Sequence, residues 1–292
     1  GVPNGGNTAD ITGFASRVIE DNLSDGAVAL FIQGCGGDIN PIGYKGVDTP
    51  RDAEPLGNLL GLSTLKGLKQ TTSQADPRLV VINETLTLPR ADVADRIAAL
   101  EAEQIRLLNS LKGTTLNLKT FLPMVVKYNL APEFPSYYSH RYLLEEKQER
   151  PDLSKLDADN RRNMKQYIEN IRTMEELTRL QTNLALLKRH QAENIAAGKR
   201  TLDVEVVGLR IGEFTLITFP GELTVQIGLN IKKGSPHRRT FVAGYTNGYI
   251  YYAPTTEQLL NVGGAQEDSD CILAPEWQGL FEKRAAEILK KL

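Results

Sequence analysis

One stretch of the chain, residues 157–197, constrains the fold more than any other feature. Apolar side chains recur there about every 3.5 residues, and charged residues flank them on both sides. This spacing predicts a long helix with one coiled-coil-like apolar seam. A lone helix would leave that seam in water, at a cost of ~25 cal/mol per Å² of apolar surface. The seam therefore needs a partner; its residues are Met164, Ile168, Ile171, Met174, Leu177, Leu184 and Leu187.

The preceding helical pattern offers the nearest partner for this seam. Residues 91–111 place Ile97, Leu100, Leu107 and Leu108 on one face. A segment rich in tyrosine and proline joins the two patterns, so we expect an antiparallel helical hairpin spanning residues 91–199. A second copy of the chain remains an alternative partner, which would make the arm a site of homo-oligomerisation.

Strand patterns lie on both sides of this insertion. Together with amphipathic helices near each end, they predict an α/β fold with a mixed α+β core sheet, built from residues 1–90 and 200–292. The segment 53–68 is expected to form a helix with Leu56, Leu59, Leu60, Leu65 and Leu68 on one face. The predicted strands are 27–32, which is continuously apolar and so fully buried, 79–88, 202–209, 214–219 and 240–245.

Composition excludes several classes of function. The chain has 292 residues, 41% of them hydrophobic, which is ample for a buried core, and its net charge of -2 argues against nucleic-acid binding. No apolar run approaches the ~18 residues of a transmembrane helix. Cys35 and Cys271 could form one disulfide, but a domain of this size does not need one, and free thiols are favoured.

Polar residues follow the first predicted strand in a glycine-rich turn. Asp38 and Asn40 lie in this turn, just after Gly36 and Gly37. Glycines allow backbone N–H groups to point at a ligand anion or an oxyanion. The alternative is a tight turn in which Asp38 and Asn40 serve as caps.

Two further strands also lead into polar turns. Glu222 follows Pro220 and Gly221, where a carboxylate can bind a metal, act as a base, or merely stabilise a helix N-terminus. Residues 245–252 hold four tyrosines in eight positions. Tyrosines can line a binding site while offering hydroxyls, or can form an ordinary aromatic edge.

The histidines are too scattered to form a recognisable motif. His140, His190 and His237 lie far apart in sequence, and His190, which follows Lys188 and Arg189, is expected to be in solvent. The sequence contains no His-x-His or His-Glu-x-x-His pattern, no Gly-x-Ser-x-Gly elbow and no phosphate-binding Gly-Lys-Ser/Thr loop. A serine-triad esterase or a nucleotide enzyme is therefore not indicated.

Taken in order, the three polar turns resemble motifs of the neutral, non-lysosomal ceramidase family. The family has Gln-x-x-x-Gly-(Asp/Asn)-x-Ser-Pro, then Pro-Gly-Glu, then Asn-x-Tyr-x-x-Tyr-x-x-Thr. This chain has corresponding residues at 33–41, 220–222 and 247–255. The resemblance covers about residues 10–90 and 200–292 and leaves the helical insertion outside it.

The resemblance implies a zinc-dependent hydrolase of an amide (N-acyl) bond. In that family one zinc is bound by two histidines, a glutamate and a tyrosine; carried over by position, the last two are Glu222 and Tyr252. The remaining residues fall into two roles by the same correspondence. Asp38, Asn40 and Tyr249 are the candidate catalytic residues, and Gly36, Gly37, Asn247 and Tyr251 are the candidate substrate-binding residues.

This chain departs from the family pattern at two places. The two zinc histidines precede the glycine-rich motif in the family, and no histidine precedes it here, so we expect the zinc site to be incomplete in this chain. We expect the two histidines to lie on an N-terminal segment of the complete protein that this sequence lacks; the alternative is that the chain binds no zinc. Asn40 stands where the family has serine, and an amide is a poor nucleophile.

The expected partner is a small-molecule amide or a lipid, which could lie at a membrane surface. The resemblance alone suggests an exported, periplasmic or extracellular protein. The alternative reading is a non-catalytic relative that keeps the fold and binds a lipid or a glycan.

Overall fold

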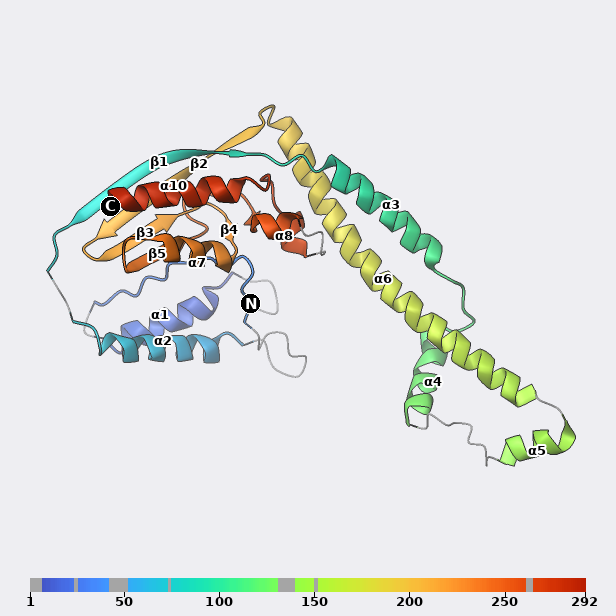
Figure 1. Ribbon diagram of the computed structural model, residues 1–292. Coiled ribbons are helices and arrows are strands. Elements are labelled where there is room, and N and C mark those ends of the chain that lie inside the picture. The colour runs from blue at the N-terminus through green and yellow to red at the C-terminus, as the bar shows by residue number, and fades with distance from the viewer. Residues whose placement is uncertain are drawn as a thin grey trace. The chain divides into compact units, whose positions relative to one another are not determined.

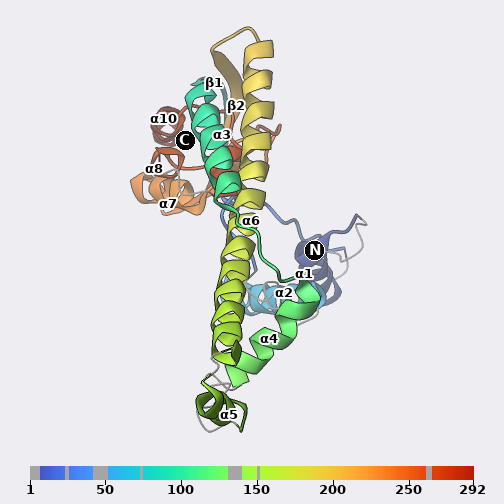
Figure 2. The same ribbon diagram turned by 90° about the vertical axis from the view of Figure 1, so that its right-hand side faces the viewer.

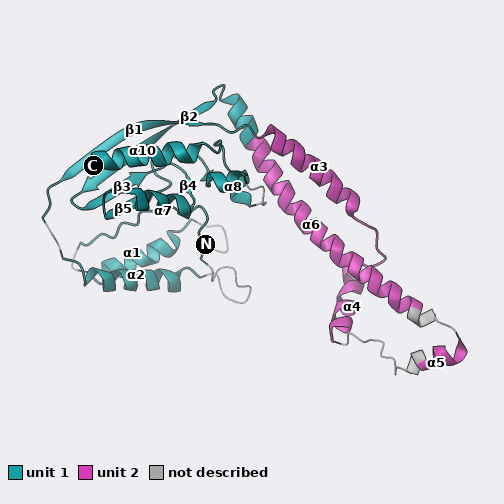
Figure 3. Ribbon diagram, viewed as in Figure 1, with its two compact units in different colours: residues 1–92, 190–292 teal, residues 93–189 magenta. Residues whose placement is uncertain are grey.

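The computed structural model describes residues 7–23, 26–41, 52–72, 75–130, 140–149, 152–260 and 265–292. The chain divides into two compact units, which are coloured separately in Figure 3: unit 1 comprises residues 1–92 and 190–292, and unit 2 comprises residues 93–189. Unit 1 contains a mixed sheet with helices, and unit 2 is helical. The predicted α/β fold with a long helical insertion is confirmed.

A four-stranded sheet forms the centre of unit 1, in the order β1 (Leu79–Pro89), β2 (Thr201–Ile211), β3 (Phe214–Thr218) and β5 (Arg239–Ala243) (Figure 1). The first three strands are antiparallel, and β5 runs parallel to β3. β1 and β2 pair from Leu79↔Ile211 to Pro89↔Thr201, so the strands on either side of the helical insertion are neighbours along their whole length. A two-residue turn joins β2 to β3, and Gly212 supplies its positive φ of 56°.

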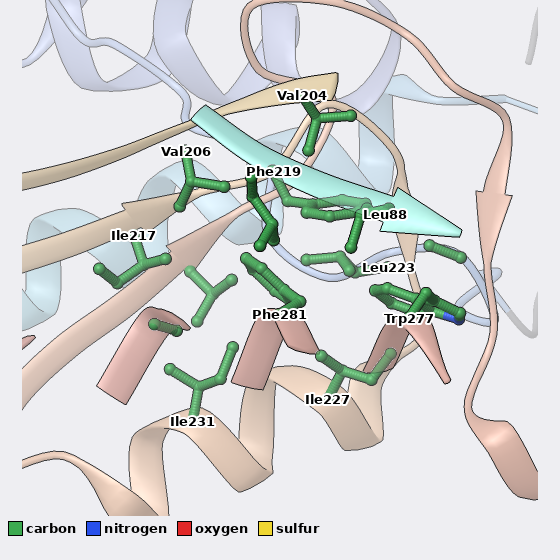
Figure 4. Close-up of a cluster of buried hydrophobic side chains, with 14 of the residues drawn as sticks. Leu88, Val204, Val206, Ile217, Phe219, Leu223, Ile227, Ile231, Trp277 and Phe281 are labelled. Atoms are coloured by element: carbon green, nitrogen blue, oxygen red, sulfur yellow. The ribbon is translucent and has the colours of Figure 1, made fainter. Parts of the chain in front are cut away.

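The core of unit 1 lies between this sheet and two helices. α10 (Trp277–Lys291) packs on β1, β2 and β3, and α7 (Val225–Gly234) packs on α10 and β5. Alternate side chains of β2 are buried, as the predicted period of two requires, whereas β3 is buried at four successive positions. Phe219 lies 4.5 Å from Phe281 and 5.3 Å from Trp277, ring centre to ring centre, and all three are fully buried (Figure 4).

Two helices before the sheet pack on each other through glycines. α1 (Asp10–Asp21) and α2 (Glu54–Leu68) approach so closely that a Cβ added at Gly57 would lie 2.5 Å from the Cβ of Phe14. α2 forms the predicted helix, and its glycines rather than its predicted leucine face make this contact. The exposed leucines of α2 are Leu56, Leu59, Leu60, Leu62 and Leu68.

The predicted buried strand at 27–32 is also wrong. The segment forms no strand, and Val28 and Leu30 are 84% and 83% exposed. An apolar run indicates a buried strand only when neighbouring strands cover it, and no described strand pairs with this segment. Gln33, the residue directly after this segment, bonds the chain that follows β5: the Gly244 N–H donates to the Gln33 carbonyl at 3.1 Å.

Unit 2 contains α3 (Ala94–Ser110), α4 (Leu118–Leu130), α5 (His140–Gln148) and most of α6 (Asp152–Ala196). α3 and α6 lie side by side and antiparallel in Figures 1 and 2, as predicted. Leu107 of α3 packs with Leu177 and Leu180 of α6. None of the helices that the structure describes is both long and apolar enough to cross a membrane.

Candidate functional site

The candidate site is built on a two-stranded parallel sheet of unit 1. β4 (Glu222–Leu223) pairs with β6 (Tyr252–Ala253), with Glu222 opposite Tyr252. The Glu222 N–H donates to the Tyr251 carbonyl at 2.9 Å. Paired residues of neighbouring strands lie ~4.8 Å apart and project from the same face. The structure therefore places the two candidate metal ligands side by side.

Two further tyrosines bind the carboxylate of Glu222. The Tyr245 hydroxyl donates to Oε2 at 2.8 Å, and the Tyr249 hydroxyl donates to Oε1. Both hydrogen bonds lie at the surface of the protein. The result is one carboxylate surrounded by three phenols, which we call the Glu222 cluster: Glu222, Tyr245, Tyr249 and Tyr252.

The loop that carries these tyrosines has a strained backbone. Tyr245, Asn247 and Tyr251 have φ values of 55°, 59° and 65°. A non-glycine residue in this left-handed region costs roughly 1–2 kcal/mol. Three N–H groups of the loop hold it by donating to carbonyls of the segment before Glu222: Tyr245 to Gly221 at 3.1 Å, Thr246 to Phe219 at 3.1 Å and Ile250 to Pro220 at 2.8 Å. Such strain persists only where surrounding contacts hold the backbone in place, and strained residues of this kind are common at functional sites.

The phenols of the cluster are held in their neutral form. Burial and the charge of Glu222 raise the pKa of Tyr252 to about 12. Burial and the hydrogen bonds to Glu222 also raise the pKa values of Tyr245 and Tyr249 well above 10. All three hydroxyls are therefore protonated at neutral pH and can donate hydrogen bonds.

The glycine-rich turn packs against the backbone of this cluster. The Gly37 N–H donates to the Leu223 carbonyl at 2.8 Å, and a Cβ at Gly37 would lie 2.3 Å from the Glu222 carbonyl oxygen. A Cβ at Gly36 would lie 2.7 Å from Nε2 of Gln33. The glycines thus allow close backbone packing, and the Gly37 N–H is already used rather than free for an anion.

Other candidate residues of the sequence analysis lie in different surroundings. Asp38 Oδ1 accepts the Val225 N–H at 2.8 Å, which caps the first turn of α7, as one of the two sequence readings proposed. Asn40 and Asn247 are exposed. Tyr251 turns toward α6, where its hydroxyl donates to Glu193 Oε1 at 3.3 Å.

Sequence reasoning missed two residues of this region. Tyr245 belongs to the tyrosine motif but was given no role of its own. His190 was expected in solvent, yet its side chain is only 1% exposed, and Nε2 lies 2.6 Å from Asp270 Oδ1. The signal was present, because position 190 continues the apolar seam three residues after Leu187. The two cysteines are free thiols, as expected.

The described residues alone do not complete a zinc site. Zinc takes four ligands in structural sites, and in catalytic sites three protein ligands and a water. The Glu222 cluster offers one carboxylate and one phenol opposite it. Within the described ranges, no group of three or more His, Cys, Asp and Glu side chains is placed to hold a metal.

Comparison with known proteins shows a ceramidase-like fold. No family model matches the sequence, and no curated protein matches it. Among solved structures, a ceramidase complexed with C2 superposes with a TM-score of 0.50 at 13% sequence identity, over 97% of this chain and 42% of that one. Neutral ceramidase from Pseudomonas aeruginosa gives a TM-score of 0.48 at 14% identity, over 97% of this chain and 40% of that one. This chain thus spans about two fifths of the ceramidase chains that it matches.

The shared carboxylate predicts the titration of the tyrosines. Replacing Glu222 with Gln removes the negative charge, so the pKa of Tyr252 should fall from about 12 toward 10, while burial keeps it somewhat above that value. Phenolate absorbance followed against pH would show this shift, and Glu213→Gln at the β2–β3 turn is the matched charge control. An unchanged titration in Glu222→Gln would mean that Glu222 does not contact these phenols.

The same shift has a consequence for stability. The folded state raises the pKa of Tyr252 above its ordinary value of ~10, so protonated Tyr252 adds to the free energy of unfolding. This stabilisation is complete below pH ~10. That contribution is lost as the pH rises through about 12.

The cap formed by Asp38 predicts a structural effect of its removal. Asp38→Ala leaves the Val225 N–H without its acceptor and should lower the free energy of unfolding by about 1 kcal/mol, measured by urea denaturation. Asp38→Asn keeps an acceptor oxygen and should lose less. Asn40→Ala, at an exposed position of the same turn, is the control and should stay within about 0.5 kcal/mol of the parent. If Asp38→Ala were as stable as the parent, the cap would contribute no stability, and Asp38 would remain a candidate functional residue.

Proposed function

We propose that this chain carries part of the active site of a ceramidase-like, zinc-dependent hydrolase of an amide (N-acyl) bond. The observation that supports this most is the parallel pairing of Glu222 with Tyr252, with Tyr249 and Tyr245 on the same carboxylate. Glu222 and Tyr252 would be two ligands of the zinc in the complete protein, and further ligands would come from outside the described residues. Zinc in such a site polarises a carbonyl and activates a water.

The chain's own residues then have roles that follow from their geometry. The hydroxyls of Tyr249 and Tyr245 each donate their single hydrogen to Glu222 in this structure. If a zinc ion took that carboxylate as a ligand, the displaced phenol, still neutral, could turn its hydrogen to an amide carbonyl and stabilise negative charge that develops on its oxygen. Asn40 is exposed on the adjoining turn and can hydrogen-bond an amide substrate. Because Asn40 lacks a hydroxyl, we propose that a water, and not this side chain, attacks the carbonyl carbon.

The exposed cluster suits a small-molecule amide or an amide-linked lipid presented at a surface.

The helical arm has a separate role in this proposal. Ile171 and Met174 of α6 are 38% and 52% exposed although they belong to the predicted seam. A second copy of the chain could cover them, so the arm is proposed as a site of homo-oligomerisation.

A specific observation supports the alternative of a non-catalytic lipid-binding relative. A cavity of about 320 Å³ lies beside the glycine-rich turn, between β5 and α7. Its walls are mostly apolar, with Lys232 among them; they include Ile32, Cys35, Phe214, Leu216, Leu229 and Phe241. Such a cavity could hold an acyl chain without any chemistry at the Glu222 cluster.

The test is amide hydrolysis by the natural protein, assayed on a set of N-acyl amides with zinc content measured in parallel. Glu222→Gln and Tyr252→Phe should each lower kcat/KM and zinc affinity by more than about 100-fold, the upper end of the effect of residues that only support ligands. Glu213→Gln and Tyr167→Phe are the matched controls and should change neither. The present chain alone should hold less than one zinc per molecule.

Two results would contradict the proposal. Hydrolysis that survives both Glu222→Gln and Tyr252→Phe would place the active site elsewhere. A natural protein that binds N-acyl lipids but hydrolyses none of them would favour the binding alternative, in which case substitutions along the cavity, such as Leu229→Glu, should abolish binding.

A further inference from the structure

A buried histidine lies behind the Glu222 cluster on the last turns of α6. The His190 side chain is 1% exposed, and its Nε2 lies 2.6 Å from Asp270 Oδ1, whose side chain is 15% exposed. Because a carboxylate only accepts, the imidazole donates through Nε2. On its other side, Nδ1 lies 3.5 Å from Glu193 Oε2. A histidine held between two carboxylates is costly to bury, so its position calls for a reason beyond filling space.

Asp270 connects this histidine to the candidate site through the backbone. The Asp270 carbonyl accepts the N–H of Tyr252 at 3.0 Å, and the next residue, Cys271, forms a β-bridge with Tyr251. The side chain of Asp270 thus binds α6 while its main chain binds β6. Any movement of Asp270 would be passed on to the residue that lies opposite Glu222.

The ring of His190 also contacts the strained part of the tyrosine loop. Its centre lies 4.5 Å from the ring of Tyr251 in an edge-on arrangement, and Tyr251 in turn contacts the ring of Tyr249 at 5.6 Å. Tyr251 has a φ of 65° and accepts the Glu222 N–H with its carbonyl. Its hydroxyl bonds Glu193, one helical turn from His190. Both ends of Tyr251 are therefore held, by α6 at the side chain and by β4 at the main chain.

We propose that the His190–Asp270 pair is a positioning unit, which locks β6 and the strained residue Tyr251 so that Tyr249 and Tyr252 stay on Glu222. The pair reaches the cluster through Tyr251, by a ring contact with His190, and through Tyr252, whose N–H donates to the Asp270 carbonyl. The end of the long helix thereby becomes part of the candidate site. This inference rests on the proposed function in one respect: the pair is proposed to position the Glu222 cluster, to which the proposed function assigns the chemistry.

An ordinary core role would make a different prediction. A core residue stabilises the whole of unit 1, and an apolar side chain of similar volume would serve about as well. A positioning pair stabilises one place, and its loss should release the loop while the sheet of β1, β2 and β3 stays closed. A metal role does not apply here either, because these groups do not form a metal-holding set among the described residues.

Hydrogen exchange of the 292-residue chain, followed residue by residue without metal or substrate, separates these roles. His190→Leu fills the volume but cannot donate, so exchange at the Glu222 and Tyr252 amides should rise at least about tenfold while amides of the β1–β2 ladder stay unchanged. His190→Gln keeps an N–H donor and should restore most of the protection. Gln191→Ala, which removes a bond from the neighbouring helical residue to Asp92, is the control and should leave the loop protected.

If His190→Leu fails to fold, Asp270→Asn carries the same test, because it removes the charge of the pair and leaves the backbone carbonyl in place. Unchanged protection at Glu222 and Tyr252 would overturn the proposal, and so would an equal loss of protection across β1–β2. Since exchange is read without chemistry, an inactive protein would not affect this result. Failure here would likewise leave the proposed hydrolase standing.

Discussion

The pairing of β4 with β6 is the constraint on which the rest of the candidate site depends. Two residues on each strand suffice to put Glu222 opposite Tyr252, and the N–H of Glu222 is satisfied by the Tyr251 carbonyl. Everything else in the region keeps this short pair in place. The glycine-rich turn packs against the backbone of β4, with no room for a side chain at Gly37. Three residues of the tyrosine loop adopt left-handed backbone conformations, and hydroxyls of that loop bond the Glu222 carboxylate.

Much of the fold could be predicted because apolar residues recur in the sequence at the spacing of a strand or of a helix. β2 alternates over its whole length, and α6 carries a seam at helical spacing, so both were found with bounds within a few residues of the structure. The segment 27–32 could not be predicted in the same way, since an apolar run does not say whether another strand will cover it. α2 is a related case, because the leucine spacing predicts a helix but does not say which face packs; its glycines contact α1, and most of its leucines are exposed.

The sequence could predict which residues belong to the candidate site, but not most of the contacts that these residues make. Strand ends that lead into Pro-Gly-Glu and tyrosine motifs pointed to Glu222 and Tyr252, which the structure places opposite each other. Sequence could not show that Asp38 caps α7, because that bond joins residues 187 positions apart. The inward direction of His190, in contrast, follows from its place three residues after Leu187 in the apolar seam, whereas its charged neighbours say little about the direction of its own side chain. The role of each residue in chemistry remains a proposal that its geometry supports.

In the proposed function, Glu222 and Tyr252 share one zinc ion. The most direct measurement is an anomalous difference map at the zinc edge, from crystals of the natural protein grown with zinc. One peak is expected within about 2.0–2.2 Å of a Glu222 carboxylate oxygen and near that distance from the Tyr252 hydroxyl, with at least one phenol displaced from Glu222. A peak elsewhere, with Tyr245 and Tyr249 still bound to Glu222, would contradict it.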